Sequence, residues 1–376
     1  MEPIALLTVG LVAATALAFD FTNGFHDTAN AMATSIATGA LKPKTAVTLA
    51  GILNLVGALL STEVAQTISG GLINEDTVSI SPAFVLAGLA GAIIWNLLTW
   101  LIGLPASSSH ALLGGLVGAV LVGAGVQGVN LSAVIDKVLV PSLVSPVVAG
   151  TAAMVAVKLI DRITARIPKG RVDEGFKHGQ TVTACLVALS HGSNDAQKTM
   201  GVITLALVAA GIQPEGSAPQ LWVVLACASA ISLGTYTGGW RVIKTVGKDL
   251  TEISTPQGFA AEVSSACSIL LSSHMGYPLS TTQVCSGAII GSGLGRSGQS
   301  VNWRVAGRML VAWLITFPMA GLMSAGACLV VQLGVGGVIA VPVVLLVATC
   351  VIRAVANRNP VHAENVGTGD QPNDAR

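Results

Sequence analysis

The sequence predicts an all-α, polytopic membrane protein made of two homologous, inverted repeats with broken or re-entrant helices. Of its 376 residues, 52% are hydrophobic and only 10% are charged, whereas a soluble domain carries about 25% charged residues. Apolar runs of about 20 residues, the length a spanning helix needs, recur from end to end. The same motifs also occur in the same order in both halves, which indicates an internal duplication.

Hydropathy places the candidate helices between short polar or Gly/Pro-containing connections. Four of them are short and rich in Gly, Ser and Thr, and we expect half-helices or re-entrant segments there: 27–41, 107–125, 194–211 and 280–294. The remaining segments are long enough for spans or buried helices: 4–22, 44–69, 82–103, 138–160, 179–193, 219–244, 257–273, 303–331 and 334–353.

The duplication is visible in two pairs of motifs. "GFHD" at Gly24 corresponds to "GSND" at Gly192, 168 residues later, and "PASSSH" at Pro105 corresponds to "PLSTTQ" at Pro278, 173 residues later. Six crossings in each half would make the repeats parallel, and five would make them inverted. We favour inversion, which many secondary transporters use, with broken helices meeting at the midplane.

Composition divides the chain into five parts. We expect a first membrane repeat at 1–160, a basic linker at 161–177, a second repeat at 178–333, an extra helix at 334–354 and a disordered tail at 355–376. The polar stretch "KLIDRITARIPKGRVDEGFK", which contains the linker, holds six of the 19 Lys and Arg residues. The positive-inside rule therefore places this loop in the cytoplasm of a multi-pass protein of the cell (inner) membrane.

Asp27 and Asp195 are the strongest functional signal, since each ends an apolar run at the same point of its repeat. A carboxylate in lipid is costly and normally faces a polar cavity or a partner. Capping of a broken helix is the structural alternative. Together with nearby amides, the carboxylates suit a site for a hard coupling cation or for a proton; these amides are Asn23, Asn30 and Asn194.

Lys198 follows Asp195 by three residues, where the first half has Asn30 after Asp27. At this helical spacing the two side chains share a face. The pair could neutralise itself, or the lysine could attract an anionic substrate.

Two clusters of hydroxyl residues follow a proline and precede a Gly-rich apolar run, a pattern typical of a helix start. They comprise Ser107, Ser108 and Ser109 in the first half and Ser280, Thr281 and Thr282 in the second. Free N–H groups, the positive end of the helix dipole and hydroxyl donors together bind tetrahedral oxyanions. Plain helix capping is the alternative.

Three histidines lie within these motifs and are candidates for proton relay, with structural roles as the alternative: His26, His110 and His191. Neither an HExxH motif nor a P-loop occurs, so we expect no enzyme, no ATP hydrolysis and no cofactor, and the identity of any metal stays open. The six cysteines lie in apolar stretches without a CxxC pair. A net charge of +1 gives no indication of nucleic-acid binding.

The paired motifs resemble the inorganic phosphate transporter (PiT) family. "NGFHDTANAMAT" and "SHGSNDAQKTMG" are similar to its two signatures, and "PASSSHALLGGLVG" and "PLSTTQVCSGAIIG" to its two Pro-Ser-Thr motifs. "TPQGFAAE", from Thr255 to Glu262, also resembles a family element. Phe25-His26 and Lys198 differ from the sodium-coupled members and resemble the bacterial low-affinity branch. His110 matches the family's motif ending, and Gln283 departs from it.

The resemblance implies a symporter that imports inorganic phosphate with a cation, as a metal–phosphate complex in some members. It implies that the hydroxyl clusters and Lys198 bind phosphate and that Asp27, Asn30 and Asp195 serve the coupling ion. For the low-affinity branch it favours H⁺ over Na⁺ as that ion. A carrier of sulfate or another oxyanion, a passive anion channel and an intramembrane hydrolase are the alternatives. Phosphate and the lipid bilayer are the expected partners, and a homodimer stays open.

Overall fold

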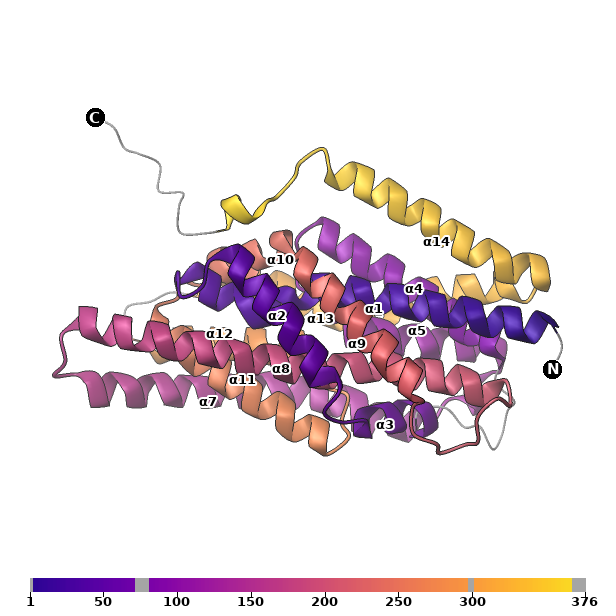
Figure 1. Cartoon of the computed structure of the whole chain (residues 1–376), viewed down its shortest axis with the longest axis horizontal. Coiled ribbons are helices and arrows are strands. Elements are labelled where there is room, and N and C mark those ends of the chain that lie inside the picture. Colours follow the sequence, from indigo (N-terminus) through magenta and orange to yellow (C-terminus); the bar gives the residue numbers. More distant parts are fainter. Residues whose placement is uncertain (1–2, 72–80, 297–300, 367–376) are drawn as a thin grey trace.

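The computed structural model describes residues 3–71, 81–296 and 301–366, and most of these residues are helical (Figure 1). The helices, in chain order, are α1 (Pro3–Ala37), α2 (Pro43–Ala58), α3 (Glu63–Gly71), α4 (Pro82–Leu101), α5 (Ser108–Gly123), α6 (Leu131–Val134), α7 (Val140–Thr164), α8 (Lys169–Ala209), α9 (Leu221–Thr237), α10 (Trp240–Lys244), α11 (Thr255–His274), α12 (Thr281–Gly295), α13 (Trp303–Val331) and α14 (Val335–Ala356). The all-α prediction is therefore confirmed.

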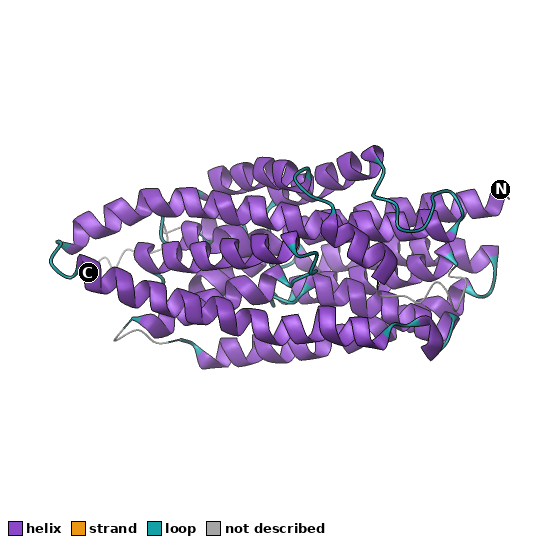
Figure 2. Ribbon diagram, turned by 90° about the horizontal axis from the view of Figure 1, so that it is seen from below, coloured by secondary structure: helices purple, strands orange, loops and turns teal. Residues whose placement is uncertain are grey.

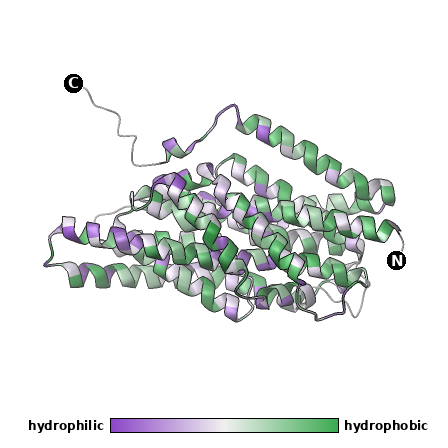
Figure 3. Ribbon diagram, viewed as in Figure 1, coloured by the Kyte–Doolittle hydropathy of each residue, from purple (hydrophilic) through white to green (hydrophobic). Residues whose placement is uncertain are grey.

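The long helices lie side by side along the longest axis of the molecule, and loops connect them at both ends (Figure 2). Within the described ranges, five helices are long and apolar enough to cross a membrane, or up to seven if two bent helix pairs each count as one span. The outer helices carry mainly hydrophobic residues, whereas hydrophilic residues gather at the turn between α7 and α8 (Figure 3). The protein is a multi-pass membrane protein.

The helices α1 and α8 are continuous, so the predicted separation of 27–41 from 4–22 and of 194–211 from 179–193 is wrong. The glycine in each motif serves close packing and does not break the helix. A β-carbon on Gly24 would lie 2.3 Å from the Ile231 carbonyl oxygen, and one on Gly192 would lie 2.3 Å from that of Asn54. Glycine is needed at both positions because backbone of the neighbouring helix occupies the space of a side chain.

The helices α5 and α12 are short, as predicted for 107–125 and 280–294. They contain 16 and 15 residues, fewer than the roughly 20 residues that cross a bilayer. The hydroxyl residues of the first turn of each helix are only 1–2% exposed, so each helix begins inside the protein. The two helix starts therefore lie in the buried interior.

Equivalent helices of each half pack against the first long helix of the other half. The first-half helix α2 packs its Gly57 against Leu189 of α8, and the second-half helix α9 packs its Gly234 against Phe21 of α1. Phe21 and Leu189 are themselves 168 residues apart, the same spacing as Asp27 and Asp195. The two halves thus interlock through matching contacts and form one unit.

The directions of equivalent helices are compatible with the predicted inverted repeat. In Figure 1, α1 starts at the N-terminus on the right and runs left, whereas α8 starts at the α7–α8 turn on the left and runs right. Each short helix packs along one long helix. Gly114 and Gly118 of α5 contact α13, and Gly287 and Gly291 of α12 contact α7.

The structure describes the linker and the first part of the predicted tail. The linker 161–177 consists of the end of α7, a short turn and the first residues of α8. The predicted disordered tail begins inside α14. Arg241 binds carbonyl oxygens of Ala356 and Asn359, and Val366 is 1% exposed. Residues 367–376 of that tail lie outside the described residues.

Candidate functional site

The starts of α5 and α12 provide matching caps. Ser107 accepts a hydrogen bond from the His110 backbone N–H (3.1 Å), and Ser280 accepts one from the Gln283 N–H (3.3 Å). A serine at this position satisfies a donor that the helix leaves unpaired. The next two hydroxyl residues of each helix remain available for other groups, and the positive dipole ends lie beside them.

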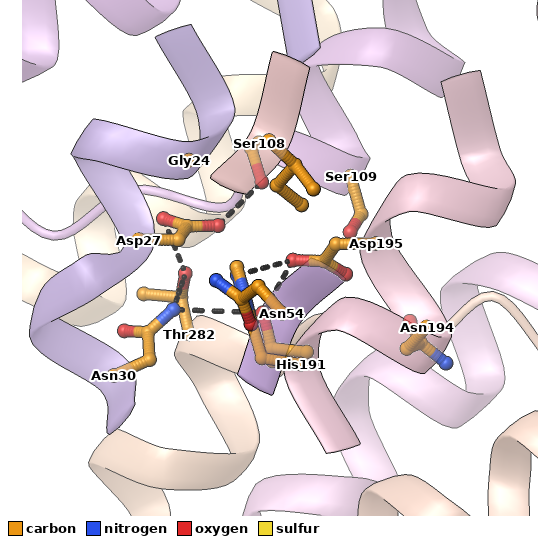
Figure 4. Close-up of polar contacts among 12 residues, drawn as sticks. Gly24, Asp27, Asn30, Asn54, Ser108, Ser109, His191, Asn194, Asp195 and Thr282 are labelled. Atoms are coloured by element: carbon orange, nitrogen blue, oxygen red, sulfur yellow. Dashed lines mark hydrogen bonds and ion pairs between the residues drawn. The ribbon is translucent and has the colours of Figure 1, made fainter. Parts of the chain in front are cut away.

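Asp27 is 1% exposed and lies between these two helix starts (Figure 4). Ser108 of α5 donates to its Oδ2 (2.6 Å), and Thr282 of α12 donates to its Oδ1 (3.3 Å). His26 Nδ1 is 2.7 Å from Oδ1. Asn30, one turn farther along α1, donates to Thr282 Oγ1 (3.0 Å). One carboxylate therefore joins both halves of the chain.

Asp195 is fully buried, and its environment contains a fixed positive charge. Thr281 donates to its Oδ2 (2.9 Å), and Lys198 forms an ion pair with its Oδ1. The same Lys198 ammonium group, itself 1% exposed, donates to Ser109 Oγ (2.6 Å) and to the Leu279 carbonyl oxygen (2.7 Å). This lysine is held by the second carboxylate and by both helix starts.

His191 lies close to both carboxylates. Its Nδ1 is 3.2 Å from Asn54 Oδ1, and its Nε2 is 2.9 Å from Asp195 Oδ2. The Asn54 amide nitrogen donates to Thr235, so its oxygen is the acceptor toward His191, and this assigns the histidine proton to Nδ1. The Nε2 atom faces a carboxylate oxygen of Asp195, and a proton or a cation between these two atoms would bridge them.

Three side chains could hold a metal ion at this point. Ligand atoms of Asp27, His191 and Asp195 lie within 4.8 Å of one another, and all three residues are buried. Carboxylate oxygens suit hard cations such as Na⁺ and Mg²⁺, whereas an imidazole nitrogen in the set suits first-row transition metals and Zn²⁺. The same three groups can also carry a proton.

The structure brings most of the predicted site residues together: Asp27, Asn30, Asp195, Lys198, His26, His191, Ser108, Ser109, Thr281 and Thr282. Ser107 and Ser280 act as helix caps. The side chain of Asn194 points away from the carboxylates and donates to Ser273 (2.8 Å) (Figure 4). Asn23 is buried, and its Oδ1 has no hydrogen-bond partner among the described residues.

His110 lies apart from the carboxylates. Its Nδ1 is 3.2 Å from Gln283 Nε2, and its Nε2 contacts Ser142. It lines a mainly apolar cavity of about 620 Å³ between α5, α7, α12 and α13. These contacts are with neutral side chains, and the predicted role in proton relay stays a prediction.

Two further buried groups were not predicted as site residues. Asn54 orients His191, and its only sequence signal is a single amide within the apolar run "GILNLVG". Glu262, the last residue of the family-like element "TPQGFAAE", is 2% exposed. It accepts hydrogen bonds from Thr34, Thr183 and Gln180 at 2.5, 2.5 and 3.1 Å. These three hydrogen bonds connect α11 to α1 and to α8.

Comparison with known proteins identifies the chain's relatives. The sequence model of the phosphate transporter family matches residues 23–324. A Mycobacterium tuberculosis (strain ATCC 25618 / H37Rv) protein named "Probable low-affinity inorganic phosphate transporter" is 56% identical over 323 residues, which cover 86% of this chain and 77% of the relative. A Bacillus subtilis (strain 168) protein of the same name is 40% identical over 333 residues, which cover 89% and 99%.

A solved structure described as "The sodium-dependent phosphate transporter" has a similar fold. It superposes with a TM-score of 0.78 at 26% identity, covering 87% of this chain and 99% of that one. The paired motifs, the membrane architecture and these matches agree, and the chain belongs to the phosphate transporter family.

Proposed function

We propose that this phosphate transporter imports inorganic phosphate by symport with a cation, with H⁺ favoured over Na⁺. The observation that carries the proposal is the meeting of two helix starts at a pair of buried carboxylates. Ser108, Ser109, Thr281 and Thr282 would turn their hydroxyl donors to phosphate, and Lys198 would add one positive charge. Helix N-termini with such donors bind tetrahedral anions well.

The charges at this site support obligatory coupling. Asp27 and Asp195 carry two negative charges when ionised, and Lys198 offsets only one of them. Adding a phosphate anion would leave at least two uncompensated negative charges, and two like charges 4 Å apart repel by about 4 kcal/mol at an effective dielectric constant of 20. A cation bound beside the carboxylates removes most of this repulsion, so phosphate and cation bind best together.

The histidine–carboxylate pairs favour a proton as that cation. His26 contacts Asp27 and His191 contacts Asp195, so an imidazole that can accept or donate a proton lies beside each carboxylate. The solved structure of a sodium-dependent relative makes Na⁺ the alternative. The grouping of Asp27, His191 and Asp195 would also accept the metal of a metal–phosphate complex.

The distribution of charge supports an orientation in the cell (inner) membrane. Basic residues gather in the α7–α8 turn at the left end of Figure 1, and α10, which carries Arg241 and Lys244, lies in the same half of the molecule. By the positive-inside rule this end, with the loop 161–177, would face the cytoplasm. The predicted homodimer stays open.

Uptake of labelled phosphate into proteoliposomes tests the proposal. We expect Asp27→Asn and Asp195→Asn each to lower the initial rate by about tenfold or more, since a hydrogen bond to a charged group contributes roughly 1.5–3 kcal/mol. Asp136→Asn, which removes an exposed carboxylate outside the proposed site, is the matched control. Unchanged rates in both site variants would refute the assignment.

The same assay separates the alternatives. Excess unlabelled sulfate should compete poorly, because a site that holds a protonated phosphate leaves an acceptor unpaired when sulfate binds. A passive anion channel would equilibrate phosphate without accumulating it against its gradient. Equal competition by sulfate would therefore favour a sulfate or general oxyanion transporter. Transport that only dissipates the phosphate gradient would favour a passive anion channel.

A further inference from the structure

A third carboxylate, Asp20, is buried in α1 outside the proposed site. It is 0% exposed and precedes Asp27 by seven residues, about two helical turns or roughly 10 Å along the axis. It lies toward the N-terminal end of α1, whereas the Thr34 contact of Glu262 lies on the opposite side of Asp27. With the orientation proposed above, Asp20 is on the outer side of the phosphate site.

The contacts of Asp20 leave its charge uncompensated. Thr199 donates to Oδ1 (3.0 Å), and no described residue makes a hydrogen bond to Oδ2. The ion pairs among the described residues involve Asp27 and Asp195 but not Asp20. An ionised carboxylate held by one hydroxyl in a membrane interior is costly, and it normally binds a proton or a cation.

The surroundings favour a proton over a metal ion. The charged or titratable groups within electrostatic reach are Asp195 and Lys198 of α8 and Cys227 of α9. Among the described residues, the grouping with metal-ligand spacing contains Asp27, His191 and Asp195 and does not include Asp20. A single carboxylate with one hydroxyl offers a metal ion too few ligands, whereas a proton needs only one oxygen.

Asp20 and Lys198 also break the symmetry of the repeats in opposite senses. At the 168-residue spacing, the second-half counterpart of Asp20 is Ala188, and the first-half counterpart of Lys198 is Asn30. Each of these two buried charges thus lacks a counterpart in the other half, and Thr199 connects them because it follows Lys198 directly and binds Asp20. This arrangement links Asp20 to the lysine that would contact phosphate.

We propose that Asp20 is the outer proton-binding carboxylate that couples proton uptake to phosphate binding through the Thr199–Lys198 segment. The proposal rests on the proposed function. One proton from external water would add to the Asp20 carboxylate and leave a neutral carboxylic acid. Lys198 would then compensate phosphate and Asp195 alone, and the same proton would pass to internal water when phosphate leaves. Proton and phosphate would each raise the affinity for the other.

Two transport modes measured in proteoliposomes test the coupling role of Asp20. Exchange of labelled for unlabelled phosphate at equal pH needs binding and alternating access but no net proton movement. Accumulation driven by an inward proton gradient needs both. We expect Asp20→Asn, which mimics the protonated acid, to keep exchange and to lose about tenfold or more of the accumulation, a coupling of the size usual between sites. Asp20→Glu should restore part of the accumulation.

Each other outcome has a defined meaning. If Asp20→Asn accumulates phosphate like the wild type, or loses exchange while remaining monodisperse, the coupling role is wrong. If that variant does not fold, Thr199→Val keeps the carboxylate and removes its donor, and it should shift the pH of half-maximal uptake; an unshifted profile overturns the role. Wild-type accumulation that needs Na⁺ and ignores the pH gradient also overturns it. Absence of wild-type exchange would instead refute the proposed phosphate function.

Discussion

The two carboxylates of the site occupy equivalent positions but differ in the charge around them. Asp27 is held by the hydroxyls of Ser108 and Thr282 and by His26, without a permanent cation. Asp195 has Lys198 as an ion-pair partner. The duplicated backbone thus places two similar carboxylates together. The second half has Lys198 where the first has Asn30, so the charge of Asp195 is compensated more than that of Asp27. Under the proposed symport, Asp27 is therefore the site carboxylate that gains more from a cation bound beside it.

The largest effect on stability should come from breaking the charged pair of the second half. Asp195→Asn leaves Lys198 buried and unpaired, and loss of one partner of a buried pair costs about 3–5 kcal/mol. Thermal unfolding in detergent should show a large decrease in Tm. Asp27→Asn should lower Tm much less, because no lysine of the described ranges forms an ion pair with Asp27.

The double variant Asp195→Asn/Lys198→Asn sharpens this comparison. It gives the second half the neutral pattern of Asn30 and should recover most of the lost stability without recovering uptake. If the double variant is as unstable as Asp195→Asn alone, the ion pair is not the source of the loss.

A smaller and symmetrical effect is expected at the two motif glycines. A β-carbon on Gly24 or Gly192 would meet a backbone carbonyl oxygen at 2.3 Å, and overpacking of this kind typically costs about 1–3 kcal/mol. Gly24→Ala and Gly192→Ala should lower the free energy of unfolding by similar amounts. Gly326→Ala is the matched control, because a β-carbon there has no neighbour within 4 Å. A loss at only one motif glycine would show that the repeats pack differently.

The smallest effects should come from single hydroxyls. Ser108→Ala removes a 2.6 Å hydrogen bond from Asp27, and Thr281→Val removes a 2.9 Å bond from Asp195. Each bond contributes roughly 1.5–3 kcal/mol to the ionised carboxylate. We expect Ser108→Ala to reduce phosphate uptake more, since Asp195 retains Lys198. Equal uptake by the two variants would contradict the proposed difference between the carboxylates.

Local patterns predicted much of this site. Pro followed by hydroxyl residues predicted the starts of α5 and α12, because capping depends on neighbouring residues. The spacing of Asp195 and Lys198 predicted their contact, because three residues nearly complete a helical turn. Acids within apolar runs predicted that Asp27 and Asp195 would face polar partners, and both are buried with hydroxyl donors on their carboxylates.

Contacts between distant helices could not be predicted in this way. Two such contacts are the hydrogen bond from Thr199 to Asp20 and the contact of Asn54 with His191. Both depend on how the two halves pack, which a local sequence pattern does not predict. The continuity of α1 and α8 through the motif glycines could not be predicted for the same reason. Glycine permits both a helix break and a close helix–helix approach, and only the neighbouring carbonyl oxygens of Ile231 and Asn54 distinguish the two.

Proton flux accompanying phosphate uptake tests the central claim most directly. A pH-sensitive dye trapped inside proteoliposomes can be recorded while labelled phosphate is added outside, without Na⁺ and with the membrane potential clamped. The account predicts that the interior acidifies in proportion to the phosphate taken up, and that Asp27→Asn abolishes both signals while Asp136→Asn changes neither. Phosphate uptake without acidification, or uptake that starts only when Na⁺ is added, would contradict it.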